Sequence, residues 1–127
     1  MARGIAGVAA GLVAWIVVAT LANVALRVAM PGYADAETPM TFTLEMMFAR
    51  LFLGAVSSVL AGAMTAWIAR SGSPRAPWIL GILLVALFIP LHLALWDKFP
   101  VWYHLTFLVS LLPLTLLGAW LTARDHR

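Results

Sequence analysis

Hydrophobic residues gather along this chain in four long stretches that contain no Asp, Glu, Lys or Arg. The stretches are Ile5–Leu26 (22 residues), Leu51–Ala69 (19), Ala76–Trp96 (21) and Val101–Ala123 (23). At a rise of about 1.5 Å per residue, a helix of any of these lengths crosses a hydrocarbon core about 30 Å thick. Because lipid offers no partner for backbone polar groups, we expect each stretch to be an α-helix. Strands of a membrane β-barrel alternate apolar and polar residues, and these stretches do not.

One long and two short connections join the four stretches. Residues 70–75 form a polar turn with Gly and Pro, residues 97–100 form a tight turn, and only residues 27–39 make a real loop. Short connections place successive helices side by side and antiparallel. The sequence therefore predicts an all-α fold: one domain over residues 1–127, an integral membrane bundle of four transmembrane helices running up, down, up and down.

The start of the second helix is ambiguous. Thr38 and Pro39 suit a helix opening, with Thr as the N-cap and Pro in the first turn. A span centred on Arg50 would cost about 2.5–3.5 kcal/mol for insertion of the charge. We therefore expect the span at residues 51–69, with a helical extension from Met40 in or above the headgroup region.

Composition excludes several classes of protein. Of 127 residues, 64% are hydrophobic and 10% are charged, whereas about 25% are charged in an ordinary soluble domain. A soluble enzyme, a disordered tail and a disulfide scaffold are excluded, the last because the chain has no Cys. The net charge is +3, but the eight Lys and Arg are scattered singly, so nucleic acid is not an expected partner. The expected partner is the lipid bilayer.

The distribution of basic residues predicts the orientation. Five of them flank the ends of helices on one side, and three lie on the other side with most of the acidic residues. The five are Arg3, Arg70, Arg75, Arg124 and Arg127. Cytoplasmic loops carry the excess of Lys and Arg, so we expect both termini in the cytoplasm and the protein in the bacterial inner (plasma) membrane. The first apolar run is too long for a cleaved signal peptide, so we expect the first helix to be retained.

Small residues at every fourth position predict where helices approach closely. The second stretch carries Gly54, Ser58, Gly62 and Ala66, and the first carries Gly7 and Gly11. Such stripes let membrane helices pack backbone to backbone. We interpret them as a contact between the first two spans, and a homo-oligomer interface is the alternative. Trp15 lies in mid-membrane, where its N–H needs a partner, and Ser57 or Ser58 has the matching depth.

Two histidines form the core of a candidate site. His92 lies six residues before Lys98 and His104 six residues after it, so in an antiparallel hairpin both lie at one depth. Facing helices are about 8–10 Å apart, which lets the two imidazoles share a hydrogen bond, a proton or a metal. The simpler interpretation is that each histidine is solvated or bonded to a backbone carbonyl.

Other polar residues share that outer layer. We expect an outward-opening pocket lined by Asn23, Arg27, Glu45, Arg50, His92 and His104. Two cations and one carboxylate suit an anionic headgroup, a quinone or a small anion. In the simpler alternative, Arg27 and Arg50 reach lipid phosphates, or Arg27 pairs with Glu45 structurally.

No cofactor is predicted. Zinc usually takes four ligands, so Glu45 or Asp97 would have to join the two histidines. A haem held by His92 and His104 would need the two rings on opposite faces of the macrocycle. We therefore predict neither a metal nor a haem at this pair.

The sequence favours a protein without catalysis of its own. It contains no G-x-S-x-G, H-E-x-x-H, phosphate-loop or EF-hand pattern. We expect a structural or accessory subunit, which packs against itself or a larger membrane complex. The alternative is a ligand-binding, transport or redox subunit that uses the pocket around His92 and His104. Small multidrug transporters have this length, but they need an acidic residue in the first helix, and Ile5–Leu26 has none.

Overall fold

The fold of this protein, in a computed structural model, is helical throughout the part described, residues 2–69 and 75–125, with side chains up to residue 122. No strand occurs in these ranges. The elements are α1 (Ala2–Ala29), α2 (Tyr33–Glu37), α3 (Leu44–Ala69), α4 (Ala76–Ala94), the 3₁₀ turn η2 (Trp96–Lys98) and α5 (Val101–Asp125). Within the described ranges, α1, α3, α4 and α5 are long and apolar enough to cross a membrane. The predicted all-α class is therefore confirmed, and each of the four predicted spans lies in a helix that is long and apolar enough to cross a membrane.

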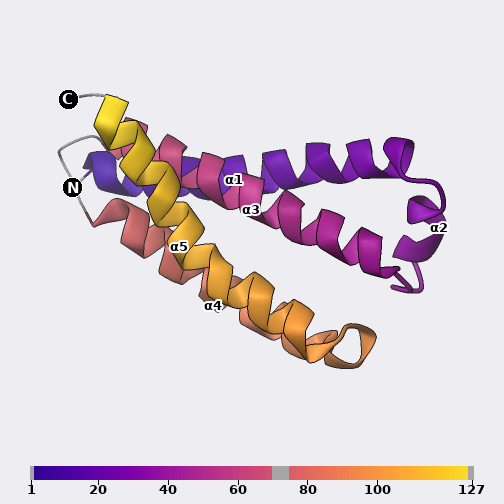
Figure 1. Ribbon diagram of the computed structural model, residues 1–127. Helices are drawn as coiled ribbons and strands as arrows, with labels where there is room; N and C mark the ends of the chain where they lie inside the picture. The colour runs from indigo at the N-terminus through magenta and orange to yellow at the C-terminus, as the bar shows by residue number, and fades with distance from the viewer. Residues whose placement is uncertain (1, 70–74, 126–127) are drawn as a thin grey trace.

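The four long helices run along the length of the molecule, and α3 lies between α1 and α5 (Figure 1). α1 begins and α5 ends at one end of the molecule, while α2 and the α4–α5 turn lie at the other, which we call the α2 end. The α4–α5 hairpin diverges from α1 toward the α2 end. Residues of α1 and of the α4–α5 hairpin line the cavity described below.

The helix boundaries differ from the prediction between residues 27 and 50. α3 begins at Leu44 and not at Met40, because Met40 has a left-handed φ of 57° that no helix accommodates. The N-cap is Thr43, whose hydroxyl accepts a hydrogen bond from the backbone N–H of Met46 at 3.3 Å. Thr38 instead follows the end of α2.

The other connections also differ in detail. The predicted 27–39 loop is largely helical, because α1 continues to Ala29 and α2 follows a left-handed turn at Gly32 (φ 82°). α4 ends at Ala94, two residues before the predicted end. Most of the predicted 70–75 turn lies outside the described residues, as do Arg70, Arg127 and the side chain of Arg124.

The glycines of α1 face α3, as predicted. A Cβ at Gly7 would lie 2.8 Å from the Thr65 carbonyl oxygen, and one at Gly11 would lie 3.0 Å from that of Ala61. Real Cβ contacts are longer, so only glycine allows this approach. The hydroxyl of Thr65 uses the proximity to donate a hydrogen bond to the Gly7 carbonyl at 2.9 Å.

The stripe on α3 packs mainly against α5, which the sequence interpretation did not foresee. A Cβ at Gly62 would overlap the Thr115 carbonyl, and a Cβ at Gly54 would meet the Phe107 ring at 2.7 Å. Ser58 faces α1 instead and accepts a hydrogen bond from Trp15 Nε1 at 3.1 Å, which confirms the predicted Trp–Ser pair. Ala66 is only partly buried. The stripe is therefore covered largely within one chain.

Candidate functional site

A cavity of about 460 Å³ lies in the half of the bundle nearer the α2 end. Trp15 of α1 and Phe88 of α4 close it toward the middle of the bundle, with ring centroids 4.7 Å apart. Its apolar wall includes Ala19, Leu53 and Leu91. The polar side chains that line it are Thr20, Asn23, Arg27, Glu37, Arg50, His92 and Tyr103. The cavity is therefore an apolar chamber with polar groups gathered in one part of its wall.

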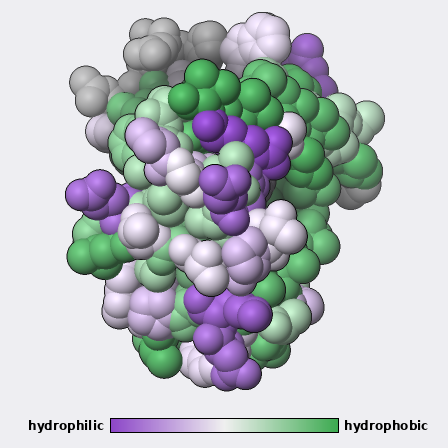
Figure 2. Space-filling model, turned by 90° about the vertical axis from the view of Figure 1, so that its right-hand side faces the viewer, coloured by the Kyte–Doolittle hydropathy of each residue, from purple (hydrophilic) through white to green (hydrophobic). Residues whose placement is uncertain are grey.

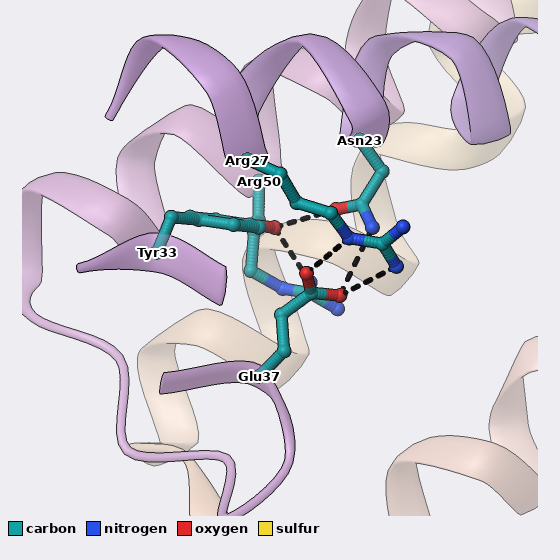
Figure 3. Close-up of polar contacts among 5 residues, drawn as sticks. All are labelled: Asn23, Arg27, Tyr33, Glu37 and Arg50. Atoms are coloured by element: carbon teal, nitrogen blue, oxygen red, sulfur yellow. Dashed lines mark hydrogen bonds and ion pairs between the residues drawn. The ribbon is translucent and has the colours of Figure 1, made fainter. Parts of the chain in front are cut away.

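An ion pair joins α1 to α2 at the rim of the cavity (Figure 3). The Arg27 guanidinium donates from Nε to Glu37 Oε1 and from Nη2 to Glu37 Oε2, the latter at 3.1 Å. Asn23 Nδ2 also donates to Glu37 Oε2 at 3.1 Å. The hydrogen bonds from Arg27 lower the pKa of the Glu37 carboxyl below its ordinary value, against a smaller opposing effect of burial. Glu37 is thus held as a carboxylate.

Arg50 lies deeper, and its hydrogen-bond partners are neutral, although its charge also contributes to the lowered pKa of the Glu37 carboxyl. Its Nη1 donates to the Tyr33 hydroxyl at 2.9 Å and its Nε to the Tyr103 hydroxyl at 3.1 Å. The guanidinium carbon lies 4.6 Å from the centroid of the Phe42 ring, a cation–π contact. Among the described residues no carboxylate forms an ion pair with Arg50, and its Nη2 has no hydrogen-bond partner.

Tyr33 connects Arg50 to the ion pair at the rim. Its hydroxyl accepts from Arg50 and donates to Asn23 Oδ1 at 2.6 Å, and Figure 3 shows it pointing between the two side chains. Tyr33 is fully buried. The described polar network therefore holds two guanidinium groups and one carboxylate, a net charge of +1 that is oriented toward the cavity.

The two histidines meet, as their equal spacing from Lys98 predicts. His92 Nδ1 and His104 Nδ1 are 2.7 Å apart, and His104 Nε2 lies 3.2 Å from the Trp96 carbonyl oxygen. The Trp96 ring stacks on His104, with centroids 4.6 Å apart. His92 lines the cavity, whereas His104 is fully buried behind it.

This geometry fits a hydrogen bond and not a pair of metal ligands. Two imidazole nitrogens on one tetrahedral zinc, each about 2.0–2.1 Å from the ion, would be about 3.3 Å apart. A haem would need the rings on its opposite faces, but here their nitrogens contact directly. Neither group fits His92 and His104 as the fold places them.

Of the six predicted site residues, four line the cavity, one supports it from behind and one lies away from it. Asn23, Arg27, Arg50 and His92 line the cavity, and His104 supports His92 from behind. Glu45 is exposed at the start of α3 and does not line the cavity. The pairing of Arg27 with Glu45 is therefore wrong: the carboxylate that Arg27 binds is Glu37, which α2 turns back toward α1.

The sequence interpretation missed Glu37, Tyr33 and Tyr103. One signal was present: Asn23 and Arg27 lie one turn apart on α1, so both face whatever segment returns over that turn. The segment that returns is α2, directly next in the chain. Nothing in the apolar pattern marked the two tyrosines as partners of Arg50.

The α2 end carries hydrophilic side chains between apolar ones (Figure 2). Asp35, Glu45, Asp97 and Lys98 are exposed, and each lies in or next to a connection at this end. The sides of the long helices are largely apolar, with Val28, Phe52 and Val109 among the most exposed hydrophobic residues. This distribution fits a polar end next to an apolar, lipid-facing belt.

Comparison of the chain with protein-family models, curated proteins and solved structures finds no match.

Proposed function

We propose that this protein binds an anionic amphiphile in the cavity between α1 and α4 and has no catalysis of its own. One observation carries the proposal: Arg50 lines the cavity as a guanidinium that has neutral hydrogen-bond partners and no ion-pair partner among the described residues. A charge in a membrane protein is costly unless it is compensated. A phosphate or carboxylate on the ligand would provide that compensation.

The position of the cavity favours an amphiphile over a free ion. Thr20 of α1 and Leu91 of α4 line the cavity and are also exposed on the outside of the bundle. We infer that the cavity opens sideways between these helices, and Val24 of α1 and Leu93 of α4 are also exposed. An acyl chain leaving through this opening would stay in lipid while its headgroup remained at Arg50.

The membrane arrangement belongs to the same proposal. The bundle runs up, down, up and down in the bacterial inner membrane, with both termini in the cytoplasm and the cavity in the outer leaflet. The five basic residues near one set of helix ends support this orientation. Because the chain has no Cys, single-cysteine variants test it: Asp35→Cys should react with an impermeant maleimide added outside cells, and Arg75→Cys should react only after lysis. The reverse labelling would overturn the orientation.

Lipid binding by the purified protein tests the function. Native mass spectrometry from mixed micelles would compare phosphatidylmethanol, which has one negative charge, with zwitterionic phosphatidylcholine. We expect wild type to prefer the anionic lipid by about 10- to 100-fold, as a charge-assisted hydrogen bond supplies about 1.5–3 kcal/mol. Arg50→Gln keeps a hydrogen-bond donor but removes the charge, and should lose that preference.

Lys98→Gln is the matched control. It removes one positive charge at the same end of the molecule, from an exposed residue that does not line the cavity. Glycerol phosphate added alone separates an amphiphile site from a free-anion site, since we expect it to compete weakly. Equal binding of both lipids by wild type would refute the proposal and favour the structural or accessory role, in a homo-oligomer or a larger membrane complex.

A further inference from the structure

The histidine pair has a fixed direction of hydrogen bonding. A backbone carbonyl oxygen can only accept, so His104 Nε2, 3.2 Å from the Trp96 oxygen, carries a hydrogen. In a neutral His104, Nδ1 is then the bare nitrogen. It accepts from His92 Nδ1 at 2.7 Å, and His92 is therefore protonated at Nδ1 and bare at Nε2.

The bare nitrogen is accessible. His92 Nε2 has no hydrogen-bond partner among the described residues. Among the described residues, every fully buried side-chain nitrogen or oxygen has a hydrogen-bond partner. Because Nε2 has none, it is not fully buried. His92 is 9% exposed and lines the cavity, which is thus the open space that its free edge meets.

The rest of the pair keeps this arrangement rigid. His104 is fully buried, with Trp96 stacked on one side and Phe99 edge-on at 5.8 Å. The His92 ring lies 4.7 Å from the Phe107 ring. A flip of the His92 ring would break its hydrogen bond to His104, and a flip of the His104 ring would break both hydrogen bonds, and each bond lost in a buried setting costs about 1–3 kcal/mol. The cavity wall therefore presents a fixed acceptor on α4 and a fixed cation, Arg50, on α3.

From this complementarity we infer that the cavity selects an anionic lipid whose headgroup also carries a hydrogen-bond donor, a hydroxyl that His92 Nε2 accepts. This inference rests on the proposed function and adds the chemical class of the headgroup. The anionic oxygen would bind Arg50, and the hydroxyl would bind His92. A headgroup with the same charge and no hydroxyl would leave Nε2 without a partner.

Two lipids of equal charge test the inference. Phosphatidylglycerol has a hydroxylated headgroup, and phosphatidylmethanol does not. We expect wild type to bind phosphatidylglycerol about 3- to 10-fold more tightly, the range that one neutral hydrogen bond supplies. His92→Phe keeps a ring of similar shape, removes Nε2, and should bind both lipids equally while still preferring them to phosphatidylcholine.

Nitrogen NMR of histidine-labelled wild type gives a measurement that needs no folded variant. The expected spectrum has protonated nitrogens at His92 Nδ1 and His104 Nε2, bare nitrogens at the other two positions, and a shift of His92 Nε2 only with phosphatidylglycerol. Equal affinity for the two anionic lipids, or an unshifted Nε2, would overturn the inference and leave the proposed function standing. Loss of discrimination against phosphatidylcholine would instead refute the proposed function.

Discussion

Replacing Gly62 with alanine tests how α3 and α5 are held at their crossing. A Cβ at Gly62 would overlap the Thr115 carbonyl oxygen and lie 3.0 Å from the Thr115 Cα. The contact is reciprocal, because a Cβ at Gly118 of α5 would overlap the Val59 carbonyl. The obstructing atoms are backbone atoms in the middle of helices, so they cannot rotate away. The two helices must separate instead.

The magnitude follows from that separation. Carbon atoms in good contact lie about 3.5–4.0 Å apart, so the 3.0 Å approach to Thr115 Cα alone requires a shift of about 0.5–1 Å, and the overlap with the carbonyl oxygen requires more. Such a gap forfeits a quarter to a half of each contact energy across the crossing. Overpacking costs about 1–3 kcal/mol, and we take the upper value because both obstructions are backbone. Alanine is about 1 kcal/mol more favourable than glycine in a helix, so the net decrease in the free energy of unfolding is about 2 kcal/mol.

Unfolding in mixed micelles titrated with dodecyl sulfate, followed by circular dichroism, measures the effect. Gly62→Ala and Gly118→Ala should each lower the free energy of unfolding by about 2 kcal/mol. The double variant should lose less than the sum, because one separation accommodates both methyl groups. Ala86→Val, on the exposed surface of α4, is the control and should change stability by less than about 0.5 kcal/mol. A Gly62→Ala protein as stable as wild type would refute the reasoning.

Three further outcomes are expected from the same unfolding assay. Trp15→Phe removes part of a buried ring as well as the hydrogen bond to Ser58. A double-mutant cycle with Ser58→Ala isolates the bond and should give a coupling of about 0.6 kcal/mol, the average for a hydrogen bond within a membrane, whereas zero coupling would contradict the bond. Thr43→Ala should cost about 1 kcal/mol as the loss of an N-cap, and Thr38→Ala clearly less; the opposite order would mean that α3 begins earlier. The partners of Glu37 lower its pKa from 4.5, so the ion pair contributes stability above that pH and loses it as the pH falls through the lowered pKa. The free energy of unfolding of wild type should therefore fall in acid, and that of Glu37→Gln should not show this fall.

The sequence was informative about the helices because spanning length and the absence of charge are local properties. Three of the four predicted spans end within three residues of the observed helix ends, whereas α3 begins seven residues before the predicted start at Leu51. The histidine contact was also within reach, since a tight turn fixes which residues of a hairpin face each other. In both cases the relevant physics acts along one segment or across one turn.

The partner of the small-residue stripe needed information from elsewhere in the chain. Gly54 and Gly62 pack against α5, although α1 precedes α3 and also carries glycines. A usable signal was Gly118, the single glycine between residues 101 and 123, which lies directly at the crossing. Helix pairing depends on which small residues coincide in depth, and adjacency in sequence is a weaker guide.

The carboxylate of the site could not be chosen from the sequence. Glu37 and Glu45 lie on either side of the start of α3, and both are plausible partners of Arg27 by distance along the chain. The choice depends on the left-handed Gly32, which reverses the chain into the short α2 and returns Glu37 to α1. A positive φ at one glycine changes the position of the following five residues, and no hydrophobic periodicity records that change.

The two arginines of the cavity differ in whether a carboxylate compensates their charge. Arg27 is paired with Glu37, so its charge is already compensated and its role in joining α1 to α2 is complete. Arg50 donates two of its five N–H groups, to Tyr33 and Tyr103, and its charge has no ion-pair partner among the described residues. A purely structural arginine would gain more from a carboxylate than from two phenols, because a carboxylate adds an opposite charge and accepts two parallel hydrogen bonds from the guanidinium. Holding the guanidinium in place without pairing its charge is the arrangement that the proposed binding of an anionic headgroup requires.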